Sequence, residues 1–401
     1  MKLNKLPKEF IHAATVIREI QANGYEAYFV GGCVRDIFLD KPIHDVDIAT
    51  SAYPEEVKQI FKRTVDVGIE HGTVLVLVDD EQYEITTFRT ESTYQDYRRP
   101  DQVTFVRSLE EDLKRRDFTI NALAMNADAE IIDLFDGMDD IHNRIIRAVG
   151  NPEERFYEDA LRMMRGLRFA SQLDFSIENK TLEAIEKFHS LLEKISVERI
   201  TVEFIKLLLG MNRKSGLIPF VETKCYQYCP GLKKYGESIL NFSDLLEKQI
   251  NSESQAWTLF IHSLNLENSE IRSFLKEWKL SNHRMQKIQQ LHYGLNQRLL
   301  DTWNSLDLYQ LGLEKALLVE ELLPYFGQIN SSEETKTQFE ALPIYERSQL
   351  AVTGNDLLEY FDKKPGKWVG ELIEYIERSV LYRQVENNKK TLLVFAEETF
   401  F

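Results

Sequence analysis

The sequence predicts an α+β protein, in which a small mixed domain over residues 1–150 precedes a long all-helical remainder. Two observations support this fold class. Short alternating apolar segments, typical of strands, occur before Asn151-Pro152 and largely disappear after it. Helical spacing of apolar residues then continues to the end of the chain. At 401 residues, the chain is long enough for several domains with sizeable cores.

The elements of the first domain are expected in a definite order. YEAYFV (25–30) predicts a strand that reaches Gly31-Gly32, CVRDIFL (33–39) a short helix and HDVDIAT (44–50) an alternating strand. SAYPEEVKQIFKR (51–63) has proline and acidic residues early and so predicts a helix start. TVLVLV (73–78) and YEITTF (83–88) flank a polar turn and predict an antiparallel hairpin.

The rest of the first domain is expected to hold a loop, a helix and a strand. RTESTYQDYRRPDQ (89–102) has no apolar period and predicts a mobile loop. LEEDLKRRDFTINALAM (109–125) has a helical pattern, and EIIDLF (130–135) predicts a last short strand. For the helical remainder we expect segments over 151–215, 216–330 and 331–401, with Trp257, Trp278 and Trp303 as packing anchors.

Composition and charge exclude some classes of protein. The chain is 43% apolar and 28% charged and contains no apolar run long enough to span a membrane. Its N-terminus lacks the apolar core of a signal peptide, so we expect a cytoplasmic protein. The net charge of −16 argues against wholesale coating of nucleic acid, but local basic groups such as Lys363-Lys364 and Lys389-Lys390 permit a nucleic-acid partner.

The three cysteines agree with a reducing compartment, which needs no disulfide framework. Cys225 and Cys229 form a C-x-x-x-C pair, but no second pair completes a tetrahedral zinc site. We therefore expect core or turn thiols.

Two carboxylates alternate in the expected strand over residues 44–50. Asp45 and Asp47 would project from one face, with Cα atoms about 6.5–7 Å apart. That spacing suits a pair of Mg²⁺ ions, which are completed by water and substrate phosphate. A solvated strand face is the alternative. Gly31-Gly32 favours the metal site, because it leaves room for a triphosphate, and Arg35 adds a guanidinium suited to phosphate.

A third carboxylate, Glu84, alternates with Thr86 and would reach the site from a neighbouring strand. The alternative is an ordinary exposed acid. His44 and His71 lie near these residues in the sequence, and we expect both to be structural.

Five stretches, taken together and in order, resemble one family. VGGCVRDIFLDKPIHDVDIATSA (30–52) resembles the first motif of the polymerase-β-like nucleotidyltransferases, specifically the class II tRNA nucleotidyltransferase and poly(A) polymerase family. RRDFTINALAM (115–125) resembles its second motif, and FDGMDDIHNRIIRAVGNPEERF (135–156) the link from head to neck. EDALRMMRGLRFA (158–170) resembles the nucleotide-selecting motif, and SVERITVEFIKLLL (196–209) the helix that braces it. The tail resembles tRNA nucleotidyltransferase C-termini more loosely.

The resemblance implies a fold and a set of site residues. It implies a polymerase-β-like head on a mixed sheet, followed by an all-α neck, body and tail, in the bacterial form without a His-Asp phosphohydrolase domain. The residues that it implies for binding the nucleotide are Gly31, Gly32, Arg35, Arg116, Asp117, Asn121, Glu158, Asp159, Arg162, Arg165 and Arg168.

The resemblance also implies a reaction. Metal ions on Asp45 and Asp47 would activate a tRNA 3′-hydroxyl for attack on the α-phosphate of CTP or ATP, and pyrophosphate would leave. Successive C, C and A would be added without a template, while body and tail hold the acceptor stem and elbow of the tRNA.

A protein can select cytosine and adenine because both present an amino donor beside a ring-nitrogen acceptor. On the expected helix over 158–170, Asp159 would accept from the amine and Arg162 would donate to the ring nitrogen, with Glu158 orienting Arg162. Guanine and uracil reverse both polarities and would leave buried groups unpaired, at about 1–3 kcal/mol each. A helix stitched by surface ion pairs is the alternative.

Other functions remain open at this point. A poly(A) polymerase shares the head motifs, although EIQANGYEAYFV (19–30) lacks the basic and aromatic stretch of bacterial versions. Partial enzymes add only C-C or only A, and the loop over 89–102 favours full C-C-A addition because C-C-adding relatives lack it. A non-catalytic RNA-binding protein is the alternative of another class. The sequence does not predict an oligomeric state.

Overall fold

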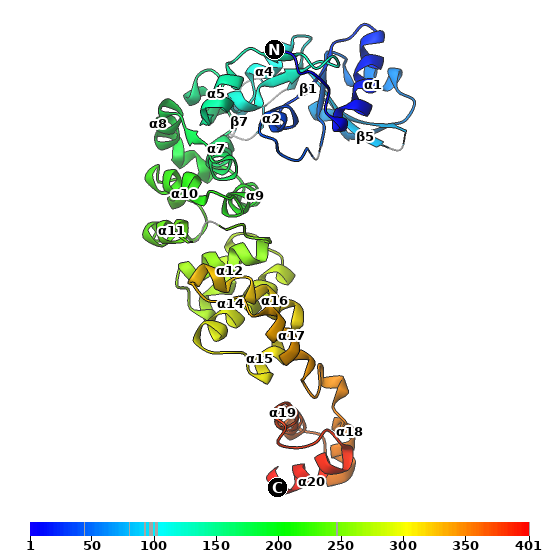
Figure 1. Cartoon of the computed structure of the whole chain (residues 1–401), viewed down its shortest axis with the longest axis vertical. Coiled ribbons are helices and arrows are strands. Elements are labelled where there is room, and N and C mark those ends of the chain that lie inside the picture. Colours follow the sequence, from blue (N-terminus) through cyan, green and yellow to red (C-terminus); the bar gives the residue numbers. More distant parts are fainter. Residues whose placement is uncertain are drawn as a thin grey trace. The chain divides into compact units, whose positions relative to one another are not determined.

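The computed structural model describes residues 1–43, 45–79, 81–91, 94–95, 99–100, 103–245 and 248–400, labelled by element in Figure 1. It divides into two compact units. The first unit comprises residues 1–249 with 277–279, and the second comprises 250–276 with 280–401. The cleft that lies beside the sheet belongs wholly to the first unit.

A mixed sheet organises the first unit. Its strands run in the order β11-β10-β1-β2-β5-β4-β3. Their bounds are β1 (Ala27–Val30), β2 (Ile48–Thr50), β3 (Thr64–Gly68), β4 (Thr73–Val78), β5 (Glu81–Thr87), β10 (Leu123–Met125) and β11 (Ile131–Asp133). β2 and β5 are parallel, with Ile48 opposite Ile85, whereas the other neighbouring strands are antiparallel. The expected mixed sheet and the β4–β5 hairpin are confirmed.

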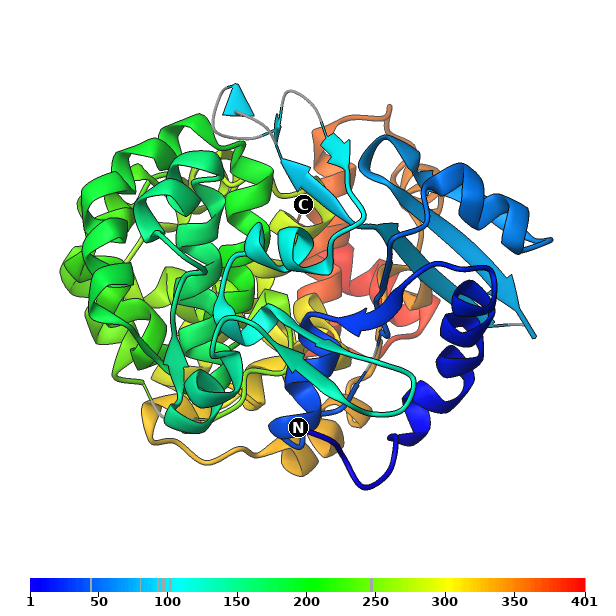
Figure 2. The same cartoon turned by 90° about the horizontal axis from the view of Figure 1, so that it is seen from above.

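Helices cover both faces of this sheet. On one face, α1 (Lys8–Ala22) buries an apolar stripe, and the Phe10 ring meets the Phe29 ring edge-on at 4.8 Å. Figure 2 shows α1 in dark blue beside the blue strands. On the other face, Leu109 and Leu113 of α4 (Leu109–Lys114) share a core cluster with Val30. The cleft opens on this second face.

The segment 109–125 is not one helix as predicted. α4 begins after Ser108, whose hydroxyl accepts from the Glu111 N–H at 3.4 Å, and it ends at Lys114. A 3₁₀ turn η2 (Thr119–Asn121) and strand β10 follow. The prediction was wrong here because β10 is buried on both faces, so its apolar residues continue the helical spacing by coincidence.

Two further local predictions need correction. Asp45 and Asp47 precede β2, which begins only at Ile48, although the Asp47 carbonyl accepts a backbone bond from Val30 at 3.1 Å. The segment 158–170 is interrupted: α6 (Pro152–Glu158) ends, and α7 (Leu161–Leu173) begins after a break of two residues. The Asp159 carboxylate accepts from the Leu161 N–H at 3.0 Å, which satisfies the start of α7 and favours the break.

The loop predicted over 89–102 contains short strand pairs. β6 (Arg89–Glu91) pairs with β9 (Val103–Phe105), and β7 (Tyr94–Gln95) pairs with β8 (Arg99–Pro100). Residues 92, 93, 96–98, 101 and 102 lie outside the described residues, as does His44, so the predictions for them stay predictions.

Helices make up most of the chain after β11, as predicted. The remaining helices of the first unit are α2 (Gly32–Phe38), α3 (Pro54–Ile60), α5 (Gly137–Asn143), α8 (Asn179–Phe188), α9 (Val197–Leu208), α10 (Arg213–Glu222) and α11 (Gly236–Ser243). A two-residue parallel pair joins β12 (Ile145–Ile146) to β13 (Ser176–Ile177).

All the regular elements that the structure describes in the second unit are helices. Its helices are α12 (Glu253–Ser263), α13 (Asn268–Glu277), α14 (Asn282–Leu300), α15 (Ser305–Leu311), α16 (Leu313–Glu320), α17 (Ser332–Glu340), α18 (Gly354–Phe361), α19 (Lys367–Leu381) and α20 (Lys389–Phe400). Trp257, Trp278 and Trp303 are buried, so the predicted packing anchors are confirmed.

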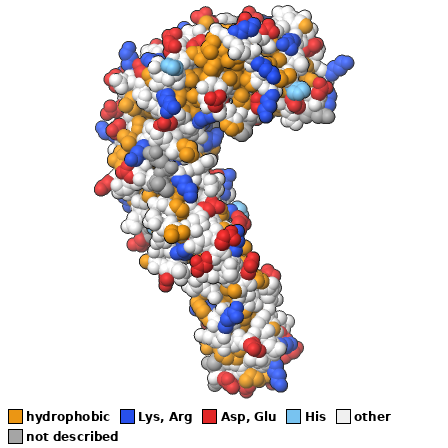
Figure 3. Space-filling view, viewed as in Figure 1, with side chains coloured by type: hydrophobic (Ala, Val, Ile, Leu, Met, Phe, Trp, Pro, Cys, Tyr) orange, Lys and Arg blue, Asp and Glu red, His pale blue; other side chains and the backbone are white. Residues whose placement is uncertain are grey.

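The described part of the chain contains no helix with the length and apolar character needed to cross a bilayer. Cys33, Cys225 and Cys229 are free thiols in buried positions, as expected. On the face drawn in Figure 3, acidic and basic side chains are intermixed.

Candidate active site

A cleft of about 890 Å³ opens where the sheet meets α7 and α9. Its lining is strongly basic, with eight arginines against three aspartates. The arginines are Arg35, Arg89, Arg115, Arg116, Arg162, Arg165, Arg168 and Arg199, and the aspartates are Asp47, Asp117 and Asp159. In a chain of net charge −16, this concentration of guanidinium groups selects an anionic ligand.

The cleft gathers most of the predicted site residues from separate stretches of sequence. Those that line it are Gly31, Gly32, Arg35, Asp47, Arg116, Asp117, Asn121, Asp159, Arg162, Arg165 and Arg168. Asp45, Glu84 and Glu158 are not part of the lining. Each of these three nevertheless interacts with a residue that is part of it.

The glycine turn leaves room for a guanidinium. Gly31 has a φ of 77°, in the left-handed region that favours glycine, and precedes α2. A Cβ at Gly31 would lie 3.0 Å from Nη1 of Arg116. A side chain here would therefore displace Arg116, which lies at the edge of the turn.

The carboxylates lie beside this turn. Asp47 directly precedes Ile48 and Glu84 directly precedes Ile85, and these two isoleucines pair across the parallel strands. The Asp47 side chain is exposed to the cleft, yet partial loss of solvent around it raises its pKa above the ordinary value, Arg116 lowers it, and Glu84 and Asp45 raise it. Three carboxylates therefore interact electrostatically in one place.

These residues fit a hard divalent cation, because a cation would offset both the desolvation and the carboxylate repulsion that raise the pKa of Asp47. Among the described residues, no group of three or more histidine, cysteine, aspartate or glutamate side chains forms a complete metal site. Mg²⁺ does not need one, because it commonly binds through one or two carboxylates together with substrate phosphates and water.

Asp117 anchors a second part of the cleft. Its buried carboxylate accepts from Arg165 Nε at 2.7 Å, from Asn121 Nδ2 at 3.1 Å and from the Phe118 N–H at 2.8 Å. Burial alone would raise its pKa, but Arg165 and these bonds lower it to about 2. Asn121 in turn accepts from Arg35 Nη1 at 2.6 Å. The chain of contacts from Arg165 to Arg35 therefore has a fixed geometry.

At the break between α6 and α7, the selecting residues are held by protein contacts. Arg162 donates to Glu158 Oε2 at 2.7 Å, as predicted, and to the Arg115 carbonyl at 2.9 Å. Asp159 also has a partner outside its own segment. Its Oδ2 accepts from Arg199 Nη2 at 2.7 Å, because the break turns it toward α9.

The residues of the cleft that the sequence did not single out include Phe169, Arg199, Arg115 and Arg89. The guanidinium carbons of Arg168, Arg35 and Arg165 lie 4.0, 5.3 and 5.6 Å from the centre of the Phe169 ring. Phe169 follows Arg168 and lies four residues after Arg165, a helical spacing that could have indicated these contacts. Arg199 and Arg115 lie in two of the motifs described above, but only the tertiary structure places them in the cleft. His71, expected to be structural, also lines the cleft.

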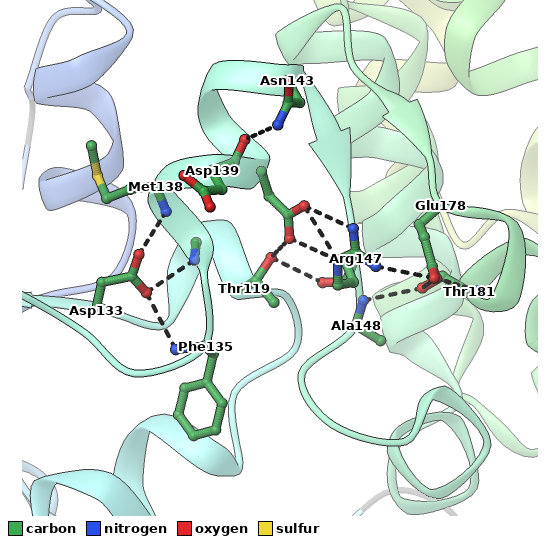
Figure 4. A network of polar contacts seen from close by, with 12 residues as sticks. Thr119, Asp133, Phe135, Met138, Asp139, Asn143, Arg147, Ala148, Glu178 and Thr181 are labelled. Carbon is green, nitrogen blue, oxygen red and sulfur yellow. Dashed lines mark hydrogen bonds and ion pairs between the residues drawn. The ribbon is translucent and has the colours of Figure 1, made fainter.

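The turn that carries Asp117 and Asn121 is braced from behind. Asp140 of α5 accepts from the Thr119 hydroxyl at 2.6 Å and from Arg147 Nε at 3.0 Å, and Arg147 Nη1 reaches Glu178 at 3.1 Å. Figure 4 shows these contacts converging, with Thr119, Arg147 and Glu178 labelled. These partly buried polar bonds therefore connect η2 and α5 to the start of α8.

Comparison with known families defines the class of this protein. A family model described as "Poly A polymerase head domain" matches residues 27–147. A second, "tRNA nucleotidyltransferase domain 2 putative", matches residues 248–396, and a third, "Probable RNA and SrmB- binding site of polymerase A", matches residues 174–235. The head and its basic cleft are therefore those of a nucleotidyltransferase.

Individual relatives define the family. The CCA-adding enzyme of Enterococcus faecalis is 65% identical over 98% of its own length and 99% of this chain. That of Ligilactobacillus salivarius is 50% identical with the same coverage. The solved structure of the Bacillus stearothermophilus CCA-adding enzyme in complex with CTP is 42% identical, with a TM-score of 0.91 over 98% of both chains. The chain belongs to the CCA-adding enzyme family of tRNA nucleotidyltransferases.

Proposed function

We propose that this enzyme adds C, C and A in succession to the 3′ end of tRNA, using CTP and ATP and releasing pyrophosphate. The observation that carries the proposal is the arginine-rich cleft, which Asp47 lines beside the sheet and Asp159 and Arg162 line beside α7, all within the same unit. Relatives that align along nearly the whole chain are CCA-adding enzymes, and this supports C-C-A addition over poly(A) synthesis.

The triphosphate would lie between the glycine turn and the arginines of α7. Arg35, Arg116, Arg165 and Arg168 supply guanidinium donors to this space, and each is held by a carboxylate partner: Asp36, Asp112, Asp117 and Glu203 in that order. Asp117 and Asn121 hold Arg165 and Arg35 in place, and we assign the ribose to the space beside them. Because these groups are fixed before the nucleotide enters, little reorganisation is needed during the reaction.

Asp45 and Asp47, with Glu84 as a third carboxylate, would hold the metal ions. Enzymes of this family use divalent metals, and we propose Mg²⁺ because the carboxylates offer it oxygen ligands. When bound, Mg²⁺ would supply activation of the attacking hydroxyl and neutralise charge on the leaving pyrophosphate. The protein orients the two substrates so that attack on the α-phosphate occurs in line.

The base would be selected at the break between α6 and α7. Asp159 would accept from the exocyclic amine of cytosine or adenine, and Arg162 would donate to the ring nitrogen. Glu158 orients Arg162 through the 2.7 Å contact. Arg199 holds Asp159, so that its carboxylate has one fixed direction.

The other parts of the chain would bind the tRNA. We propose a catalytic head over 1–150, a base-selecting neck over 151–215, a body over 216–330 and a tail over 331–401. Exposed lysines such as Lys364 and Lys367 would contact phosphates of the acceptor stem and elbow. We place the enzyme in the cytoplasm, consistent with its three free, buried thiols.

The test is incorporation of labelled CTP and ATP, alone and together with Mg²⁺, onto tRNA that lacks its 3′ end. We expect two C and then one A. Asp45→Asn and Asp47→Asn should each reduce the rate by at least about a thousandfold, because each removes a metal ligand. Asp40→Asn, an exposed aspartate a few residues earlier, is the matched control and should keep the rate.

Other outcomes would assign a sister activity. Addition of C alone, of A alone onto a preformed C-C end, or of a long A tail would each replace C-C-A addition. No incorporation by folded protein would contradict nucleotidyl transfer altogether and would favour the RNA-binding alternative.

A further inference from the structure

Asp112 of α4 is a buried carboxylate that bonds to residues on three sides. Its Oδ1 accepts from Arg115 Nη2 at 2.7 Å and from the Arg89 N–H at 3.3 Å, and its Oδ2 accepts from Arg116 Nη2 at 3.0 Å. Its side chain is 1% exposed. A charge so far from water is tolerated only with such partners, so the carboxylate and the two arginines act as one group.

One of these arginines reaches the proposed triphosphate site. Arg116 contacts Asp112 through Nη2, while its Nη1 lies against Gly31. The same guanidinium lowers the pKa of Asp47. An unpaired arginine samples many rotamers, and the bond to Asp112 removes much of that freedom on the side away from the nucleotide.

The other arginine connects α4 to the base-selecting group. The Arg115 side chain bonds to Asp112, and the Arg115 carbonyl accepts from Arg162 Nη2 at 2.9 Å. The neighbouring Lys114 carbonyl accepts from Arg155 Nη1 at 3.1 Å. These carbonyls stand at the C-terminal end of α4, where a helix has unpaired acceptors and favours positive charge.

We infer that Asp112 is a positioning residue for nucleotide binding, which fixes Arg116 for the triphosphate and, through Arg115 and the end of α4, fixes Arg162 for the base. This inference rests on the proposed function, because that function assigns Arg116 and Arg162 to the nucleotide. Asp112 acts through these arginines and is itself covered by them.

Removing the charge of Asp112 should raise KM for the nucleotide more than it lowers kcat. In Asp112→Asn, the amide replaces one acceptor oxygen by a donor, so that one arginine loses its partner. We expect KM for CTP and for ATP to rise about tenfold with kcat within about twofold, because the lost contact is equal in ground and transition states. Discrimination against UTP should also fall, because Arg162 becomes less firmly held.

The experiment compares Asp112→Asn, Asp112→Glu and Glu111→Gln in the full chain. Glu111 is exposed on the same helix and Glu111→Gln loses the same charge, so this variant should behave like the unchanged protein. The readouts are KM and kcat for each nucleotide, CTP binding by titration calorimetry without tRNA, and the thermal midpoint. Asp112→Glu keeps the carboxylate one methylene further out and should partly rescue KM.

A double variant separates positioning from a general loss of stability. Because Asp112 acts partly through Arg116, Asp112→Asn should raise KM less in the Arg116→Gln background than in the unchanged protein. Additive effects, or an unchanged KM in folded Asp112→Asn, would overturn the inference. If Asp112→Asn does not fold, a wild-type KM in Asp112→Glu would overturn it. Failure of the unchanged protein to extend tRNA would contradict the proposed function, while CTP calorimetry would still report on Asp112.

Discussion

Phe169 shows how one apolar residue can organise a charged site. Three guanidinium groups surround its ring, and each has its own acidic or amide partner. Arg168 lies 2.6 Å from Glu203, Arg165 bonds to Asp117, and Arg35 bonds to Asn121. The ring keeps the like charges apart and attracts each of them through its π face.

Replacing this ring by an aliphatic side chain should weaken nucleotide binding. We expect Phe169→Leu to raise KM for CTP about three- to tenfold, because cation–π attraction of about 0.5–2 kcal/mol is lost from each arginine. Phe175→Leu is the control: Phe175 is also buried in the same core cluster and lies outside the lining of the cleft. Equal KM values in the two variants would show that lost packing alone explains the effect.

Asp117 should make stability depend on acid pH. Its pKa is about 2 in the folded protein against an ordinary 3.8, so its stabilising effect is present above about pH 4 and is lost as the pH falls toward 2. Between about pH 4 and pH 2, the unfolding free energy of Asp117→Asn should therefore fall by about 2 kcal/mol less than that of the unchanged protein. Denaturant titrations at several pH values would measure it, with exposed Asp139→Asn as the control. Parallel pH profiles for Asp117→Asn and the unchanged protein would contradict the assignment.

At the scale of single residues, the sequence predicts chemistry better than contacts. The Glu158–Arg162 pair was predicted correctly, because the two residues are close neighbours along the chain. The contact of Asp159 with Arg199 was not, because Arg199 lies on another helix and no local spacing relates the two. Phe169 was not singled out from the sequence, because an aromatic residue on a helix is usually part of the core.

At the scale of elements, the joint between η2 and α5 is a backbone contact. A Cβ at Gly137 would lie 2.3 Å from the Thr119 carbonyl oxygen, so α5 can approach η2 only with glycine at this position. Asp133 accepts from the N–H groups of Gly137 at 2.9 Å and Met138 at 2.8 Å, which fixes the start of α5 (Figure 4). The distance between these two elements is therefore set by main-chain atoms.

A methyl group at this joint should force the elements apart. We expect Gly137→Ala to cost about 1–3 kcal/mol of unfolding free energy, because backbone cannot yield as a flexible side chain does. It should also reduce kcat/KM, since Asp117 and Asn121 stand on either side of Thr119. Gly68→Ala should be tolerated, because its Cβ would meet the nearest atom at an ordinary 3.7 Å. Calorimetry and steady-state kinetics would test both, and a fully stable and active Gly137→Ala would show that the joint adapts.

Element prediction succeeded where the pattern was long and local. The β4–β5 hairpin and most helices after residue 151 follow from apolar period and turn residues. It failed for the start of β2 and for β10, which are short and are decided by pairing with distant strands. It also missed β3, although Val65 and Val67 alternate there and β3 pairs with the neighbouring β4. The parallel pairing that brings Glu84 beside Asp47 is likewise a product of the whole sheet.

At the scale of the whole molecule, an acidic chain recognises an acidic substrate. The net charge is −16, yet the cleft and exposed lysines before and within α19 are basic. The net negative charge of the protein repels tRNA, and the basic cleft and tail lysines attract it. Binding in wrong orientations is therefore disfavoured, and the contacts at the basic sites determine the affinity.

Tail lysines should therefore control tRNA affinity and its dependence on salt. We expect Lys364→Gln and Lys367→Gln each to raise KM for tRNA, with KM for CTP unchanged. Each should lower the slope of log K against log salt by about one, because one phosphate contact is lost. Lys276→Gln, at an exposed lysine elsewhere in the second unit, is the control. An unchanged salt slope would show that the tail lysines do not touch phosphate.

The buried thiols make the protein convenient for spectroscopy. Burial raises the pKa of Cys33 to about 11 and that of Cys225 to about 12, and the pKa of Cys229 is also raised. Because maleimides and iodoacetamides attack the thiolate, the native cysteines should remain almost unlabelled while the protein is folded. One cysteine introduced on the surface of each unit would then accept a fluorophore without any native thiol being removed. Energy transfer between the two dyes would then report whether the distance between the units changes during successive nucleotide additions.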